Sequence, residues 1–141
     1  MKRALSITAV VATGFIACAA AGVSQAQPKG GGGGHFDPHN PKVYVVGKYL
    51  VVDQEPIVIV KDDKRTDITW ELPPAPSPYR FHEDGIAIDA DQFLGCRVVA
   101  GGLKYACTDK AGRSVKKYPY RVTVYGADNK PLTTDASVQN E

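Results

Sequence analysis

Two cysteines that lie eleven positions apart, Cys96 and Cys107, flank the feature that most constrains the fold of this 141-residue chain. Between them, an apolar run leads up to Gly101-Gly102 and resumes after it, as in two strands that a tight glycine turn joins. If Ala100 faces Leu103 across the turn, the same register places the two cysteines opposite each other. We therefore predict a β-hairpin with its own disulfide bond, which stabilises the fold by about 2–3 kcal/mol.

The rest of the chain also has the pattern of short strands. Runs rich in β-branched and aromatic residues alternate with Gly, Pro and charged turns, and no twelve-residue segment keeps a helical period with caps at both ends. Six to eight strands at this spacing predict an all-β fold, a small and mostly antiparallel β-sandwich of immunoglobulin-like architecture. The strands predicted outside the hairpin are 43–46, 49–52, 57–60, 68–72, 86–88 and 118–125.

The N-terminus has the pattern of a secretory signal peptide. Lys2 and Arg3 precede an apolar or small stretch over 4–23, and Ser24 and Ala26 fit the small-residue pattern of a cleavage site. We predict cleavage after Ala26 and export to the periplasm or beyond the cell. An even pair of cysteines in the remaining chain agrees with such an oxidising compartment.

Cleavage divides the chain into a signal peptide over 1–26, a flexible Gly-rich linker over 27–42 and a β-sandwich domain over 43–141. Two alternatives stay open for the N-terminal stretch. One is an uncleaved membrane anchor, since the stretch is long enough to span a bilayer. The other is lipid attachment at Cys18, although the residues before it only loosely resemble a lipobox.

The charge of the chain changes with cleavage. The chain has 17 basic and 15 acidic residues, and the leader carries both surplus bases. The neutral mature chain has no general electrostatic affinity for nucleic acid. Its charges are also segregated, because 53–91 holds 10 acids and 4 bases whereas 97–130 holds 8 bases and 2 acids. Either the opposite charges of the two segments pair locally and cancel, or the segments form a two-signed surface that docks a charged partner.

The second interpretation gives a candidate binding surface for a protein or an acidic polymer of the envelope. Basic residues interleaved with tyrosine favour interfaces, where Arg and Tyr are common anchors. The hairpin tip, Gly101-Gly102, completes this predicted surface. Its other residues are Lys110, Arg113, Lys116, Lys117, Tyr118 and Arg121.

The three histidines give an alternative function, a periplasmic site for copper or zinc. His35, His39 and His82 all have acidic neighbours, and imidazole with carboxylate suits these metals. His35 and His39 are four residues apart, which brings two rings together only on a helix. The glycine run over 30–34 and Pro38 oppose a helix at this place.

We predict no enzymatic activity and no cofactor. The chain has no Gly-x-Ser-x-Gly motif, and its mature part has no cysteine left over for nucleophilic catalysis. The segments Ile-Thr-Trp-Glu-Leu-Pro (68–73) and Phe-His-Glu-Asp-Gly-Ile-Ala-Ile (81–88), the cysteine hairpin and the C-terminal 131–140 resemble small secreted β-sandwich proteins of proteobacteria. The resemblance implies secretion and a β fold, and it supplies no catalytic residues. The sequence thus predicts an exported binding or structural module of the cell envelope.

Overall fold

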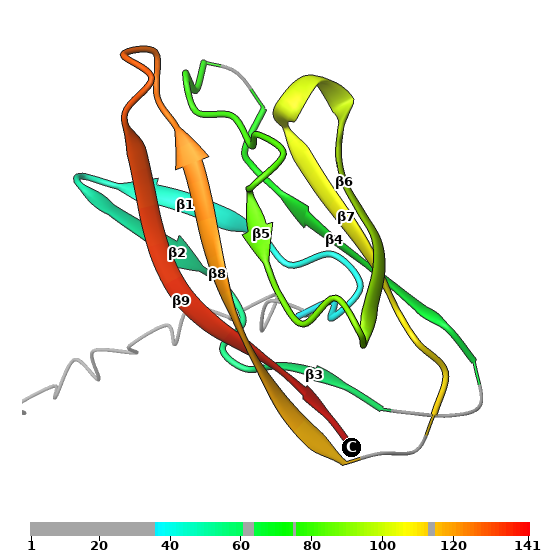
Figure 1. Ribbon diagram of the computed structural model, residues 1–141. Helices are drawn as coiled ribbons and strands as arrows, with labels where there is room; N and C mark the ends of the chain where they lie inside the picture. The colour runs from blue at the N-terminus through cyan, green and yellow to red at the C-terminus, as the bar shows by residue number, and fades with distance from the viewer. Residues whose placement is uncertain (1–35, 61–63, 75, 113–114) are drawn as a thin grey trace, which may run out of the picture. The chain divides into compact units, whose positions relative to one another are not determined.

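The computed structural model describes residues 36–60, 64–74, 76–112 and 115–141. Within these residues it has nine β-strands and one short 3-10 turn, so the all-β prediction is confirmed (Figure 1). The described residues hold no helix with the length and hydropathy of a membrane span. The strands are β1 (Val43–Val46), β2 (Tyr49–Val52), β3 (Ile57–Ile59), β4 (Thr66–Glu71), β5 (Ile86–Ala87), β6 (Phe93–Val99), β7 (Lys104–Asp109), β8 (Lys116–Tyr125) and β9 (Pro131–Asn140).

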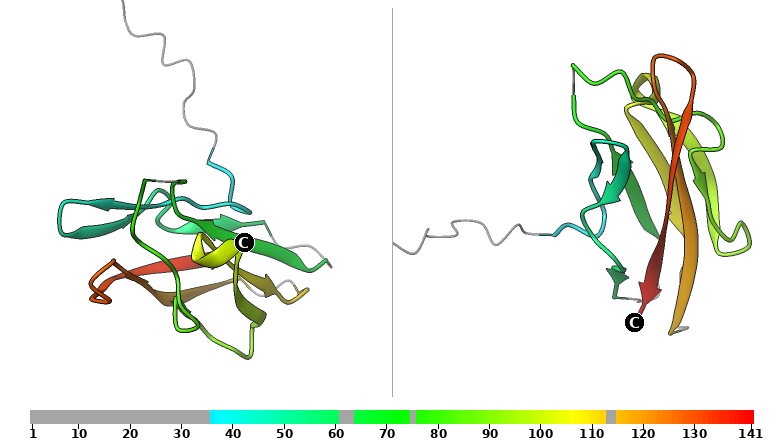
Figure 2. Two further views of the ribbon diagram at one scale, coloured as in Figure 1. Left: turned by 90° about the horizontal axis from the view of Figure 1, so that it is seen from above. Right: turned by 90° about the vertical axis from the view of Figure 1, so that its left-hand side faces the viewer.

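The strands form two larger sheets and a separate hairpin, which Figure 2 shows from two further directions. One sheet has the order β4-β7-β6 and the other the order β3-β9-β8-β5, while β1 and β2 pair with each other. Neighbouring strands are antiparallel except β3 and β9, which are parallel. The strands β4 to β9 can be lettered B to G in chain order. One sheet then contains B-E-D and the other G-F-C, which are the strand neighbours in the two sheets of an immunoglobulin-like sandwich. The sandwich differs in its disulfide bond, which stays within one sheet.

The core lies between the two larger sheets and is built from the alternate residues that each strand turns inward. Trp70 on β4 is fully buried, and its indole N–H donates to the Tyr120 hydroxyl on β8 at 3.2 Å. The two rings meet edge to face, with centroids 5.3 Å apart. Burial raises the pKa of Tyr120, so its hydroxyl stays protonated. Phe93 on β6 contacts Tyr118 on β8 in the same manner, so aromatic pairs hold the sheets together.

Strand β9 was not among the predicted strands, although it lies in the middle of the four-stranded sheet. It pairs with β8 over ten residues, from Pro131 beside Tyr125 to Asn140 beside Lys116. Its sequence is rich in Thr, Asp, Ser and Gln, so it lacks the apolar alternation that reveals a half-buried strand. Its buried apolar residues are Ala136 and Val138, and the partly buried Leu132 also packs against the core.

The hairpin of β6 and β7 has the predicted register near its turn, where Val99 faces Lys104. The predicted two-residue turn is wrong. Ala100 and Leu103 belong to the turn itself, since the Leu103 N–H donates to the Ala100 carbonyl. Ala100, Gly101 and Gly102 all have a positive φ, between 51° and 87°. Glycine adopts a positive φ at little steric cost, so two of these three residues suit the turn.

The predicted disulfide bond joins Cys96 and Cys107, whose Cα atoms are 4.1 Å apart. The two residues are not directly opposed as the sequence suggested. The register shifts between Leu94 and Arg97, and Gly95 has a φ of 61°. A bulge that begins with a left-handed glycine therefore fits Gly95 and Cys96 together against Cys107.

Residues 39–42, at the end of the predicted linker, lie along the outer edge of β4. The Thr69 N–H donates to the His39 carbonyl, and the Glu71 N–H donates to the Pro41 carbonyl. The Glu71 carboxylate then contacts the Lys42 ammonium and, at 3.2 Å, the Lys104 ammonium of β7. These backbone bonds and ion pairs hold residues 39–42 against the sheet.

Replacing this carboxylate should remove an acid-sensitive part of the stability. The hydrogen bond from Lys42 lowers the pKa of Glu71, so its stabilisation is present above the pKa of the unfolded chain. It is lost as the pH falls through the lower pKa of the folded state. Urea unfolding should show Glu71→Gln less stable by about 0.5–1 kcal/mol at pH 7, with the difference shrinking toward pH 3. Asp91→Asn, on an exposed loop, is the control, and a pH-independent difference for Glu71→Gln would contradict the prediction.

Candidate functional site

The structure keeps only part of the predicted basic surface. Lys116 and Lys117 are exposed at the start of β8. Arg121 is also exposed, but its guanidinium binds Asp135 on β9 at 2.8 Å and lowers the pKa of that carboxyl. Lys110 is half-buried, and its N–H donates to the Gln92 carbonyl. Arg113 lies outside the described residues.

Tyr118 does not belong to any surface, which corrects the prediction. The side chains of β8 alternate, so that Lys117 and Arg121 face outward while Tyr118 and Tyr120 face the core. Tyr118 is 5% exposed, and the Lys116 ammonium lies 4.8 Å from the centroid of its ring. The ring therefore serves the core and leaves no aromatic anchor on this part of β8.

The hairpin tip lies at the other end of the sandwich from the start of β8, as Figure 1 shows, and Lys116 is the first residue of β8. The Phe81 N–H donates to the Gly102 carbonyl, and Arg80 pairs with Tyr125, the last residue of β8. A Cβ atom on Gly102 would lie 3.0 Å from both the Arg80 side chain and the Phe81 carbonyl. The tip is packed against these residues, so it and the basic residues do not form one site.

Local pairing accounts for part of the charge segregation. Lys104 from the basic segment pairs with Glu71 from the acidic segment, because β7 lies beside β4. Arg121 pairs with Asp135, and Lys130 contacts Asp128 at 3.5 Å in the turn before β9. These bases contribute little positive potential to a docking surface.

The structure does not bring the described histidines together. His39 lies beside β4, where its Nδ1 is 3.2 Å from the Asp67 carbonyl. His82 is stacked on the Tyr125 ring in the other sheet, with centroids 4.1 Å apart. His35 lies outside the described residues. Within the described part of the chain there is no group of three His, Cys, Asp or Glu residues that suits a metal ion.

The hairpin of β1 and β2 exposes an apolar face that was not among the predicted sites. Its register pairs Tyr44 with Val51 and Val46 with Tyr49, and all four side chains point the same way. We call these four residues the hairpin face. Their exposed fractions are 42%, 44%, 61% and 64%, in that order. A monomer rarely leaves adjoining large apolar side chains in water, which makes this face a candidate for docking.

The opposite side of the same hairpin is anchored in the core. Val43 is fully buried and Leu50 is 5% exposed, and β2 lies against β9. At the base of the hairpin, the Lys42 N–H donates to the Asp53 carboxylate and the Asp53 N–H donates to the Lys42 carbonyl. The hairpin face is therefore held in place by packing on one side and by backbone bonds at its base.

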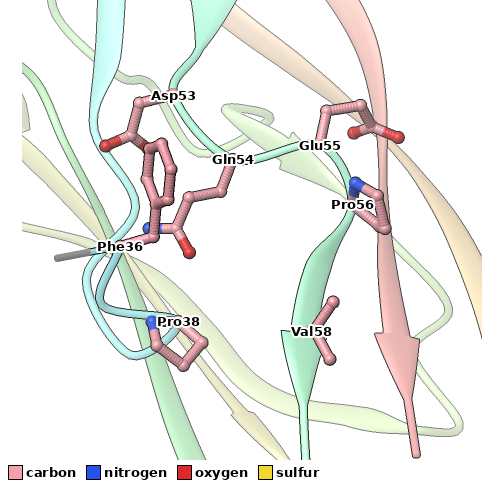
Figure 3. Close-up of a pocket in the computed structure, with 7 residues that line it drawn as sticks. All are labelled: Phe36, Pro38, Asp53, Gln54, Glu55, Pro56 and Val58. Atoms are coloured by element: carbon pink, nitrogen blue, oxygen red, sulfur yellow. The ribbon is translucent and has the colours of Figure 1, made fainter. Parts of the chain in front are cut away.

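A hollow of about 520 Å³ lies beside β3 and combines apolar walls with carboxylates (Figure 3). The Glu55 carboxylate accepts hydrogen bonds from the N–H and hydroxyl of Ser137 on β9. The Gln54 side chain donates to the Asp37 carbonyl at 2.8 Å and ties the N-terminal segment to this wall. The residues that line the hollow are Phe36, Pro38, Asp53, Gln54, Glu55, Pro56 and Val58.

Neither feature could be recognised as a site from the sequence. The runs Val-Tyr-Val-Val (43–46) and Tyr-Leu-Val-Val (49–52) are apolar on both faces, which is also the pattern of fully buried strands. The hollow exists because residues 36–38 return to residues 53–58, a contact that no local pattern encodes. Comparisons with protein-family models, curated proteins and solved structures found no match to this chain.

Proposed function

We propose that this protein is an exported, non-enzymatic binding module of the cell envelope, and that the hairpin face is its docking surface. One observation carries the proposal, namely that four large apolar side chains lie side by side in water on a hairpin whose reverse side is buried. The N-terminal signal pattern supports export. Because core packing already positions the hairpin, binding does not have to order it, which reduces the entropic cost of association.

The hairpin face is small for a strong interface. Four side chains supply only part of the roughly 800 Å² that each partner buries in a standard complex. We therefore expect a dissociation constant in the micromolar range. The two tyrosine hydroxyls and the Lys48 ammonium, 5.5 Å from the Tyr49 ring centroid, give the face a polar rim.

Sedimentation with isolated cell envelopes tests this function. The double variant Val46→Thr/Tyr49→Ser should weaken binding to the envelopes by about thirtyfold or more, and so lower the fraction of protein that sediments with them. Truncated interface anchors each cost more than about 1 kcal/mol, so two of them cost more than about 2 kcal/mol. Val60→Thr is the matched control, because Val60 is 80% exposed but lies outside the hairpin. A double variant that sediments as the parent does would overturn the hairpin face as the docking surface.

Salt separates this surface from the lysine pair of β8. Contacts through the hairpin face should persist when the salt concentration is raised to about 0.5 M, whereas binding through exposed lysines should fall because salt screens exposed charges. Lys116→Gln/Lys117→Gln should accordingly leave sedimentation unchanged. If this variant and high salt both abolish binding, an acidic polymer held by the lysines replaces the proposed apolar contact.

A further inference from the structure

Strand β3 has a free edge in the four-stranded sheet. It pairs with β9 on one side, and no second strand follows it in the sheet order of the described residues. The Glu141 N–H donates to the Ile59 carbonyl at 2.9 Å, so Ile59 directs its backbone groups toward β9. In a parallel pair, alternate residues face the neighbouring strand. Val58 therefore turns its N–H and carbonyl away from β9, and neither has a partner among the described residues.

The hollow lies at this free edge. Figure 3 shows β3 with β9 on one side and Phe36 and Pro38 on the other. Phe36 is 62% exposed and Val58 is 38% exposed, so the walls offer apolar surface to a ligand. A volume of about 520 Å³ lies within the range of ligand sites and accommodates a few residues of extended chain.

The charge of the hollow is one-sided. Asp53 and Glu55 are among its lining residues, and no Lys or Arg of the described residues lines it. Glu55 uses both carboxylate oxygens on Ser137. Asp53 uses Oδ1 to accept the Lys42 N–H, and its Oδ2 has no partner among the described residues. A basic side chain is the complement that this carboxylate lacks.

We propose that the hollow binds an extended, basic and apolar peptide segment of a partner protein, which adds a strand to the free edge of β3. The peptide backbone would pair with the Val58 N–H and carbonyl, as in other cases of strand addition. One aliphatic side chain would lie against Phe36 and Val58, and a neighbouring Lys or Arg would reach Asp53. A second copy of this chain that paired through its own β3 edge would bring the same acidic rim. This site is separate from the hairpin face and does not rest on it.

Synthetic peptides provide the probe. Fluorescence anisotropy with the purified protein should show binding of a labelled peptide of alternating valine and lysine. The matching valine–glutamate peptide should bind at least tenfold more weakly. Asp53→Asn retains the oxygen that accepts the Lys42 N–H but removes the charge, so it should weaken the lysine peptide about two- to fivefold. Tyr49→Ser, on the hairpin face, should bind the peptide as the parent does, which separates this site from the proposed docking surface.

Backbone exchange identifies the edge itself. Saturating lysine peptide should slow hydrogen exchange at the Val58 amide by tenfold or more. Val58→Pro removes that N–H from the side of β3 that faces away from β9, and it should weaken binding about five- to tenfold. If this proline disturbs β3, Phe36→Ser supplies the second test, because it removes an exposed wall of the hollow and should weaken binding at least threefold.

Three results would overturn the proposal. The first is that the lysine peptide does not bind at millimolar concentration. The second is that the lysine and glutamate peptides bind equally well. The third is that the peptide does not slow hydrogen exchange at the Val58 amide. Protection of Val58 that rises with protein concentration, in the absence of peptide, would assign the edge to a second copy of the chain instead.

Discussion

Replacing Trp70 by alanine should lower the free energy of unfolding by about 3–5 kcal/mol, the range for removing a large aromatic side chain from a packed core. Trp70 is fully buried and joins the two sheets through its contact with Tyr120. Its loss opens a cavity between the sheets and leaves the buried Tyr120 hydroxyl without its donor. A domain of this size is stable by only about 5–15 kcal/mol, so this loss is a large share of the total free energy of unfolding.

Urea unfolding followed by far-ultraviolet circular dichroism measures this difference. Tyr49→Ala is the matched control, because this aromatic residue is 64% exposed and should change the stability by less than about 0.5 kcal/mol. Tyr120→Phe should fall between the two, at about 1–3 kcal/mol, because it leaves the indole N–H buried without an acceptor. A Trp70→Ala variant with the stability of the control would show that the sheets do not depend on this contact.

The sequence predicted strands well where apolar residues were frequent, and less well where pairing decides the structure. The runs that became β1, β2, β3, β4 and β8 are rich in β-branched and aromatic residues, which favour the pleated and half-buried surface of a sheet. Strand β9 is held by its long register with β8 rather than by its own composition. Its Thr133 and Thr134 suit a strand, but Asp135 and Ser137 interrupt the apolar pattern.

The candidate sites were harder to predict than the strands. The two-residue alternation along β8 was sufficient to predict that Tyr118 faces the core. Its placement on the surface gave more weight to the local mixture of basic and aromatic residues than to this alternation. The exposure of the hairpin face could not be predicted, because its apolar residues fit a buried strand equally well. The free edge of β3 depends on which strand lies beside it. That pairing joins residues 57–59 to residues 138–140, and local sequence patterns do not encode such a long-range contact.

Removing the disulfide bond should lower the free energy of unfolding by about 3 kcal/mol, since the bond restricts a short loop in the unfolded chain. The test is Cys96→Ala/Cys107→Ala, compared with the parent and with the parent after reduction. Alanine is preferred to serine because Cys107 is 1% exposed, and a hydroxyl there would be buried. The variant and the reduced parent should agree within about 1 kcal/mol, because both lack the same restriction of the unfolded chain. A variant as stable as the oxidised parent would contradict the prediction.

The same variant also separates stability from binding. The disulfide bond joins β6 and β7, whereas the hairpin face lies on β1 and β2 and the hollow lies beside β3. Neither surface includes a residue of the β6–β7 hairpin. The double alanine variant should therefore unfold at a lower urea concentration and still bind envelopes and the lysine peptide with the affinity of the parent, at temperatures where it is folded. If either affinity falls together with stability, the strength of that surface depends on the whole sandwich rather than on the residues assigned to it.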